Sequence, residues 1–181
     1  MTVYLIRHGK TAGNLTGRYI GATDEPLCSQ GIAELQTRAY PAVQRVFVSP
    51  MKRCGETASL LYPGVKQTVV PDLRECDFGL FEGKNYAELN GRADYQAWID
   101  SGGELPFPEG ESRKTFAARC VAAFRQAMKT VTEENVAFVV HGGTIMAIME
   151  ACAKPPQNYF CWQVKCGEGF ALETDGSWRK L

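Results

Sequence analysis

The chain has 181 residues, of which 45% are hydrophobic and 22% are charged, a composition typical of one globular domain. Lys and Arg together number 20, as do Asp and Glu, so the formal net charge is zero and general electrostatic binding to nucleic acid is disfavoured. No apolar run approaches the ~18 residues of a membrane span. The first ten residues lack the pattern of a secretion signal, so we expect a cytoplasmic protein with no membrane partner.

The seven cysteines are scattered and odd in number, and none forms a CxxC pair. In a protein without a secretion signal this favours reduced thiols over disulfides. The chain has only two histidines, His8 and His141, which are too few for an ordinary histidine-based metal cage. We therefore predict no metal and no other cofactor.

Strand-like and helix-like segments alternate in the first part of the chain. Residues 2–6 are rich in β-branched and aromatic side chains, as buried strands are. Ser29 precedes an amphipathic run and is the expected N-cap of its helix. In chain order the pattern predicts strands at 2–6, 45–49 and 66–71, the last ended by Pro71, and helices at 29–40 and 52–62.

From about residue 72 to residue 112 the pattern loosens, and glycine and proline become frequent. This composition predicts a loop-rich insertion with one short helix around residues 86–99. Apolar spacing then predicts a long amphipathic helix over 112–131, for which Ser112 is the expected N-cap. The remaining elements are expected to be a buried strand at 135–140, a helix at 144–153, and edge strands joined by glycine turns in 158–181.

The alternation predicts an α/β fold, a three-layer α/β/α sandwich whose largely parallel sheet is covered on both faces. In such sheets ligands bind beyond the carboxyl ends of the strands. Arg7 and His8 directly follow the first strand, and His141 directly follows the fourth. We therefore expect these three side chains at the edge where a ligand would bind.

Glycine follows each histidine, as Gly9 and Gly142, and would let the backbone turn sharply and approach a ligand closely. Arg53 lies in the first turn of the helix after the second strand, where its planar guanidinium could bind phosphate oxygens. Each feature has a plainer alternative, because a histidine after a strand is often a core residue and Arg53 equally fits a solvated helix face.

The segment ECDFGLFEG supplies the carboxylates of Glu75, Asp77 and Glu82 among apolar neighbours and glycines. A carboxylic acid in apolar surroundings can have a raised pKa and act as a proton donor. A solvated loop carboxylate is the alternative for each of them. No GxxxxGK[ST] or GxGxxG segment is present, so no nucleotide-binding loop is indicated.

These segments resemble, in order between residues 3 and 143, the signatures of the histidine phosphatase superfamily, which includes the cofactor-dependent phosphoglycerate mutases. The matching segments are RHGKTAGN, SPMKRCGETA, ECDFGLFEG, FPEGES and VVHGG. The resemblance implies a phosphoglycerate mutase-like fold over residues 1–181, as a single domain with an insertion at about 80–112 that covers the active site.

The resemblance also implies residue roles and a reaction that needs no metal. The nucleophile that becomes phosphohistidine would be His8, and the proton donor would be Glu75. The phosphoryl oxygens and the substrate would be held by Arg7, Arg53 and His141, with Asn14 and Gly142 beside them. Phosphoryl transfer depends mainly on positioning and charge stabilisation, which two arginines and a second imidazole can supply.

The short chain and the segments FGLFEG and FPEGES look more similar to bacterial phosphatases than to the longer mutases. We therefore expect a phosphomonoester hydrolase for a small molecule, with α-ribazole 5′-phosphate as the leading substrate. A phosphoglycerate mutase, a broad-specificity phosphatase, and a phospho-ligand-binding protein without turnover remain alternatives, and the oligomeric state stays open. The aromatic side chains of the insertion could contact an aromatic leaving group or form a small satellite core; they are Phe81, Tyr86, Tyr95, Trp98 and Phe107.

Overall fold

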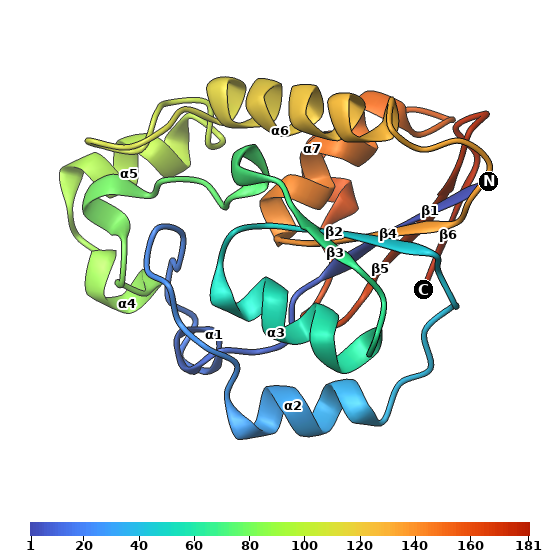
Figure 1. Ribbon diagram of the computed structural model, residues 1–181. Coiled ribbons are helices and arrows are strands. Elements are labelled where there is room, and N and C mark those ends of the chain that lie inside the picture. Colours follow the sequence, from blue (N-terminus) through green and yellow to red (C-terminus); the bar gives the residue numbers. More distant parts are fainter.

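A six-stranded sheet in the order β3-β2-β4-β1-β5-β6 forms the centre of the molecule (Figure 1). The computed structural model describes all 181 residues. The first four strands of the chain run parallel to one another, whereas β5 runs antiparallel to both of its neighbours, β1 and β6. The strands are β1 (Thr2–Arg7), β2 (Arg45–Val48), β3 (Gln67–Val69), β4 (Val136–Val140), β5 (Gly169–Glu173) and β6 (Trp178–Lys180).

Helices cover both faces of this sheet, with α2 and α3 on one side and α6 and α7 on the other (Figure 1). The predicted three-layer α/β/α sandwich is thereby confirmed. None of the helices combines the length and apolar character that a membrane span requires. The helices are α1 (Ala12–Leu15), α2 (Ser29–Gln36), α3 (Lys52–Leu61), α4 (Tyr86–Leu89), α5 (Ala93–Asp100), α6 (Arg113–Met128) and α7 (Gly142–Cys152), and short 3₁₀ turns are η1 (Pro71–Leu73), η2 (Gly79–Phe81) and η3 (Tyr159–Trp162).

Both faces of the central strands are buried, which explains why their sequences are continuous apolar runs. Successive side chains of β1 alternate between two apolar clusters: Val3 and Leu5 belong to the cluster that includes residues of α6 and α7, and Ile6 to the cluster that includes residues of α3. In the first cluster the rings of Phe47 and Phe138 stack with their centroids 4.7 Å apart. The strands β1 and β4 are therefore fixed by buried apolar contacts on both faces of the sheet.

Several predicted element ends are wrong by a few residues. Cys28, and not Ser29, is the N-cap of α2: its Sγ accepts a hydrogen bond from the backbone N–H of Gly31 at 3.3 Å. Strand β3 ends at Val69, and Pro71 opens η1, because its fixed φ suits the first position of a helical turn. Helix α6 has the predicted N-cap, Ser112, which accepts a hydrogen bond from the N–H of Thr115.

Helix α7 begins at Gly142, two residues before the predicted start, and His141 is its N-cap. The helix α1 was not predicted, because four residues are too short for a periodic pattern. The C-terminal tail also differs from the expectation of edge strands: β5 lies inside the sheet, between β1 and β6, and only β6 forms the edge.

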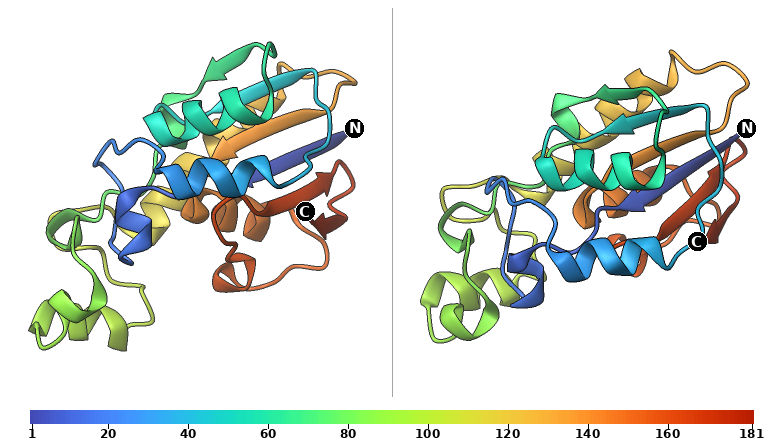
Figure 2. Two further views of the ribbon diagram at one scale, coloured as in Figure 1. Left: turned by 90° about the horizontal axis from the view of Figure 1, so that it is seen from below. Right: turned by 60° about the horizontal axis from the view of Figure 1, so that its bottom comes forward.

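We call residues 80–112 the cap. It holds two helices, α4 and α5, instead of the single predicted one, because Gly91 turns the chain between them with a φ of 83°. Figure 2 shows the cap, in light green to yellow, projecting from the sheet on the side away from the N-terminus. Phe81 and Leu89 are fully buried in the small apolar cluster that holds the cap together.

Candidate active site

The register of the sheet brings the two histidines together. Arg7 of β1 lies opposite Val140 of β4, so His8 and His141 are the first residues beyond two neighbouring strand ends. The backbone N–H of His8 donates to the carbonyl of Val140 at 2.9 Å, and the two imidazole rings lie with centroids 5.2 Å apart. Both rings are buried, with 4% of His8 and none of His141 exposed.

A single hydrogen bond defines the tautomer of His8. Its Nδ1 lies 2.7 Å from the backbone carbonyl oxygen of Gly9. Because a carbonyl oxygen only accepts, Nδ1 must carry the proton, and the lone pair of the neutral ring is on Nε2. His8 is among the residues that line the main cavity, so its ring has access to a ligand.

The surroundings of both imidazoles favour the neutral form. Burial lowers the pKa of His8 well below its usual value, and the nearby positive charges of Arg53 and Arg7 lower it further. Burial is also the main cause that lowers the pKa of His141, and a charge on this ring would in addition be repelled by a proton on His8 and by the two arginines. A neutral imidazole is the form that can attack phosphorus.

Arg7 and the start of α7 converge on one side of the cavity. The Nη1 of Arg7 donates to the carbonyl of Val164 at 2.7 Å, while its buried Nε has no partner. A Cβ on Gly142 would lie 3.5 Å from the Arg7 guanidinium, so the first turn of α7 approaches this cation closely. A helix N-terminus with free N–H groups beside a guanidinium is suited to bind an anion such as phosphate.

Arg53 lies behind His8 instead of lining the cavity, and so does His141. The Arg53 side chain is fully buried. Its Nη1 donates to the carbonyl of Thr23 at 2.8 Å, and its Nη2 donates to the carbonyl of Gly21 at 3.0 Å. Arg53 was expected to hold phosphoryl oxygens, but the structure places its terminal N–H groups on backbone carbonyls, outside the residues that line the cavity, while its positive charge acts on His8.

Glu75 lies between β3 and the cap, in a partly buried position at the cavity wall. Its Oε1 accepts a hydrogen bond from the N–H of Cys76 at 3.0 Å. Burial raises the pKa of its carboxyl group, against the opposing effects of that hydrogen bond and of Arg53 and Arg7. A Cβ on Gly143 would lie 2.8 Å from Oε1, so the second glycine of VVHGG leaves room for the carboxylate.

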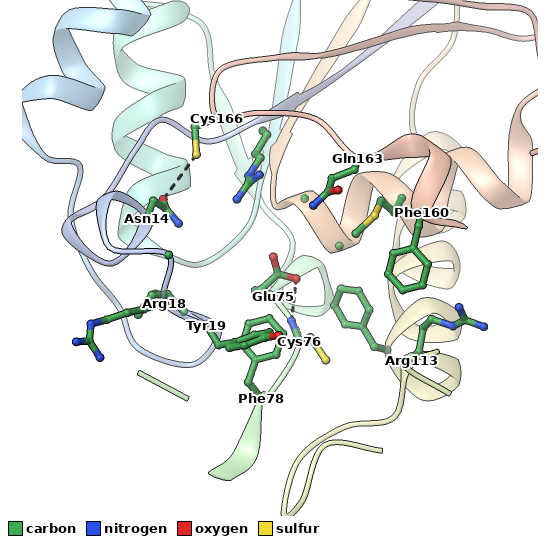
Figure 3. Close-up of a pocket in the computed structure, with 18 of the residues that line it drawn as sticks. Asn14, Arg18, Tyr19, Glu75, Cys76, Phe78, Arg113, Phe160, Gln163 and Cys166 are labelled. Carbon is green, nitrogen blue, oxygen red and sulfur yellow. Dashed lines mark hydrogen bonds between the residues drawn. The ribbon is translucent and has the colours of Figure 1, made fainter. Parts of the chain in front are cut away.

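Asn14 lines the cavity at the short helix α1. Its Oδ1 accepts from the backbone N–H of Thr11 at 3.1 Å, as part of a capping box. The Sγ of Cys166 lies 3.7 Å from the same oxygen. In Figure 3 this pair lies on the opposite side of Glu75 from Tyr19 and Phe78. Because Oδ1 is engaged, the amide nitrogen of Asn14 is the atom left to meet a ligand.

The cavity has a volume of about 520 Å³. One wall carries the charged and polar groups described above, and the other is aromatic. Of the five aromatic residues considered in the insertion, Trp98 and Phe107 line the cavity, whereas Phe81 is fully buried in the cap cluster and Tyr86 is 74% exposed. No three His, Cys, Asp or Glu side chains gather in an arrangement that could hold a metal ion.

Two residues of the segment SPMKRCGETA support the histidines and were not singled out as such from the sequence. The Oγ of Ser49 lies 2.7 Å from Nε2 of His141, and both are buried. The Oγ1 of Thr57 accepts from the N–H of Gly9 at 3.0 Å and donates to the carbonyl of Arg53 at 2.6 Å. Ser49 directly follows β2 and Thr57 lies on α3, within a segment that resembles a family signature. Their place in that segment was the signal from which their supporting role could have been predicted.

Fold and site together define an α/β enzyme with a buried histidine pair at an anion-binding edge. The chain belongs to the histidine phosphatase superfamily (branch 1), whose family model matches residues 3–177. It is 28% identical to the adenosylcobalamin/alpha-ribazole phosphatase of Salmonella typhimurium, over 99% of both chains.

Two solved structures show the same fold. The alpha-ribazole phosphatase of Shigella flexneri has a TM-score of 0.81 and 25% identity, over 96% of this chain and 90% of the other. The phosphoglycerate mutase of Thermus thermophilus has a TM-score of 0.76 and 28% identity, over 100% and 98% of the two chains. The predicted family and the phosphoglycerate mutase-like fold are confirmed, and the protein is a phosphatase of the histidine type.

Proposed function

We propose that this phosphatase hydrolyses a phosphomonoester whose leaving alcohol carries an aromatic base, α-ribazole 5′-phosphate, through a phosphohistidine formed at Nε2 of His8. The observation that carries the mechanism is the hydrogen bond from Nδ1 of His8 to the carbonyl of Gly9, 2.7 Å long. It leaves the Nε2 lone pair free in a ring that burial and two arginines keep neutral.

In the first step the lone pair of Nε2 attacks phosphorus in line, and the bond from phosphorus to the ester oxygen breaks. Burial raises the pKa of the Glu75 carboxyl group and so favours its protonated form, which gives a proton to the leaving oxygen. In the second step the Glu75 carboxylate takes a proton from water, and the resulting hydroxide attacks phosphorus. The bond from phosphorus to Nε2 then breaks, which returns His8 to its neutral form and releases inorganic phosphate.

The phosphoryl oxygens are held by the groups that converge beside His8. Arg7 and the first N–H groups of α7, at Gly142, supply donors at the cavity wall, and the amide of Asn14 lies nearby. Arg53 and His141 lie behind His8. Arg53 contributes its positive charge, and His141 contributes an imidazole ring whose Nε2 is hydrogen-bonded to Ser49. These donors and charges supply the electrostatic stabilisation of the transition state without a metal ion.

The residues that line the cavity favour a leaving alcohol that carries an aromatic group and no charge. Tyr19, Phe78, Trp98 and Phe107 line it, and the rings of Trp98 and Phe107 stack with centroids 5.0 Å apart. Two arginines at its rim are already paired with glutamates of this chain: Arg18 with Glu88, at 2.7 Å, and Arg113 with Glu104. A carboxylate or a second phosphate on the substrate would have to displace these glutamates before it could bind either arginine. The names of the similar proteins from Salmonella and Shigella both include alpha-ribazole phosphatase, which favours this substrate.

The test is a steady-state screen in the presence of a chelator. The panel holds α-ribazole 5′-phosphate, p-nitrophenyl phosphate, phosphoserine, sugar phosphates, and 3-phosphoglycerate with and without a bisphosphoglycerate primer. We expect α-ribazole 5′-phosphate to exceed every other substrate about a hundredfold in kcat/KM. Uniformly weak hydrolysis would favour a broad-specificity phosphatase, primer-dependent isomerisation a mutase, and no turnover a phospho-ligand-binding protein.

Two variants separate the proposed roles. His8→Ala should abolish both turnover and the acid-labile phosphoenzyme, whereas Glu75→Gln should still form phosphoenzyme from p-nitrophenyl phosphate, whose leaving group needs no proton. With an alkyl phosphate, Glu75→Gln should form none. Phosphoenzyme in His8→Ala would show that the nucleophile is another residue.

We also propose a cytoplasmic location. All seven cysteines are free, as expected of thiols in a reducing compartment. Measuring the free thiols of the protein in fresh lysate, by alkylation before unfolding and after it, would test whether its cysteines are reduced, as this location requires. Seven alkylated thiols after unfolding in non-reducing buffer are expected, and fewer would indicate oxidised cysteines.

A further inference from the structure

Glu82 closes the segment ECDFGLFEG, and no step of the mechanism above uses it. It lies in the cap, directly after η2. Its carboxylate accepts two hydrogen bonds from the backbone N–H of Gly21, at 2.9 and 3.1 Å, and one from the N–H of Thr23, at 2.9 Å. A carboxylate of the cap is therefore bound to a loop that belongs to the N-terminal part of the chain.

Arg53 binds the backbone carbonyl groups of the same loop. Besides the carbonyls of Gly21 and Thr23, its Nη2 also approaches the carbonyl of Ile20, at 3.3 Å. The carbonyl of Ile20 and the N–H of Gly21 belong to one planar peptide unit, so they point in opposite directions. Glu82 and Arg53 thus bind the two ends of the same peptide plane.

The loop is also fixed against the residue that follows the proposed acid. A Cβ on Gly21 would lie 1.9 Å from the carbonyl oxygen of Cys76, so the loop packs directly on the backbone next to Glu75. Ile20 at the same time lines the cavity. A rotation of this peptide plane would therefore disturb the acceptors of Arg53 and the cavity wall together.

We propose that Glu82 is a positioning residue that holds the guanidinium of Arg53 behind His8 by fixing the peptide planes of residues 20–23. The inference rests on the proposed roles of His8 and Arg53. Without the carboxylate of Glu82, the backbone N–H groups of Gly21 and Thr23 lose the acceptor that they share, and the peptide planes of this loop become free to rotate. The carbonyls then no longer hold Arg53 in one place, and the cation that favours a neutral nucleophile and an anionic phosphoryl group moves away.

The first test is the variant Glu82→Gln, which keeps the size of the side chain but replaces one oxygen by an NH2 group. This donor would face the N–H of Gly21, which now has an acceptor at 3.1 Å, and would push the remaining oxygen away from its two partners. The kcat/KM of this variant for p-nitrophenyl phosphate should fall about 10–100-fold, as in metal sites that lose an outer hydrogen-bond partner. The matched control is Asp94→Asn, also in the cap, where the carboxylate binds Arg92 and the N–H of Tyr95 but no residue of the loop. The control should retain wild-type kcat/KM.

A double-mutant cycle with Arg53→Met then separates positioning from general loosening of the cap. If Glu82 acts through Arg53, adding Glu82→Gln to Arg53→Met should lower kcat/KM less than twofold. An equal loss in both backgrounds would mean that Glu82 acts by another route and would overturn the proposal, as would wild-type activity of Glu82→Gln alone.

A titration of the two histidines gives a second readout that needs no turnover. The chain has only His8 and His141, so their ring signals in NMR spectra are readily assigned from single variants. Displacement of the Arg53 charge should raise the pKa of both rings in Glu82→Gln. Unchanged titration would overturn the proposal even if Arg53→Met fails to fold. Because this readout is independent of catalysis, it also remains valid if the phosphatase mechanism itself proves wrong.

Discussion

Lowering the pH from 7 to 5.5 should destabilise the fold by about 2.5 kcal/mol through its two histidines. His8 and His141 are buried and their pKa values are lowered well below the usual one, so we expect the folded protein to take up few protons on these rings in this range. The unfolded chain takes them up, with the ordinary pKa of about 6.5. The unfolded state thus binds more protons as the pH falls, and stability is lost below about pH 6.5. Each histidine contributes about 1.3 kcal/mol over the interval.

The carboxyl group of Glu75 acts in the opposite direction, since its pKa is raised in the folded state and stability is gained as the pH falls through that value. The measurement is therefore made in Glu75→Gln, by urea unfolding followed through the fluorescence of the three tryptophans. The added variant His8→Asn should halve the pH dependence. A free energy of unfolding that is constant within about 0.5 kcal/mol between pH 7 and 5.5 would refute the reasoning, because the histidines would then be as protonated when folded as when unfolded.

Three further outcomes follow from the contacts of the site. Gly143→Ala places a Cβ 2.8 Å from Oε1 of Glu75 and should lower kcat for alkyl phosphates more than for p-nitrophenyl phosphate; equal losses would contradict a disturbed proton donor. Ser49→Ala removes the 2.7 Å hydrogen bond to Nε2 of His141 and should cost about 1–3 kcal/mol in urea unfolding, whereas an unchanged midpoint would mean that the ring finds another partner. Phe81→Ala, in the fully buried cap cluster, should cost about 3–5 kcal/mol of unfolding free energy; stability within 1 kcal/mol of wild type would show that the cap unfolds separately.

The position of the histidine pair could be predicted from the sequence because it depends on few facts. Two apolar runs end in His-Gly, and parallel strands in one sheet end at one edge. Only the register was unknown, and the pairing of Arg7 with Val140 makes the two histidines neighbours. The order of the five segments then determined the family, and with it the layers of the fold.

The features that the sequence did not predict depend on contacts between distant segments. Nothing local to Arg53 indicates that its terminal N–H groups bind the carbonyls of Ile20, Gly21 and Thr23, because those residues are 30 to 33 positions away. Similarly, Trp98 and Phe107 reach the cavity while Phe81 does not, and this depends on how the two cap helices fold back. The N-cap at Cys28 was missed for a local reason, since a thiol is a weak acceptor that competes poorly with a neighbouring serine in general.

The nucleophile and two of the aromatic residues that line the cavity are carried by different parts of the protein. His8 follows β1, whose neighbours in the sheet are β4 and β5, whereas Trp98 and Phe107 come from the cap. The attacking nitrogen of His8 thus follows a central strand, whose amide hydrogens we expect to exchange last. Trp98 and Phe107 lie in the cap, whose amide hydrogens we expect to exchange much sooner. Changes in the cap beyond Glu82 can consequently alter which alcohol is released while the transfer of the phosphoryl group to nitrogen stays the same. Grafting a different segment between residues 84 and 112, with Glu82 kept, would be a direct way to redirect this enzyme to another phosphate ester.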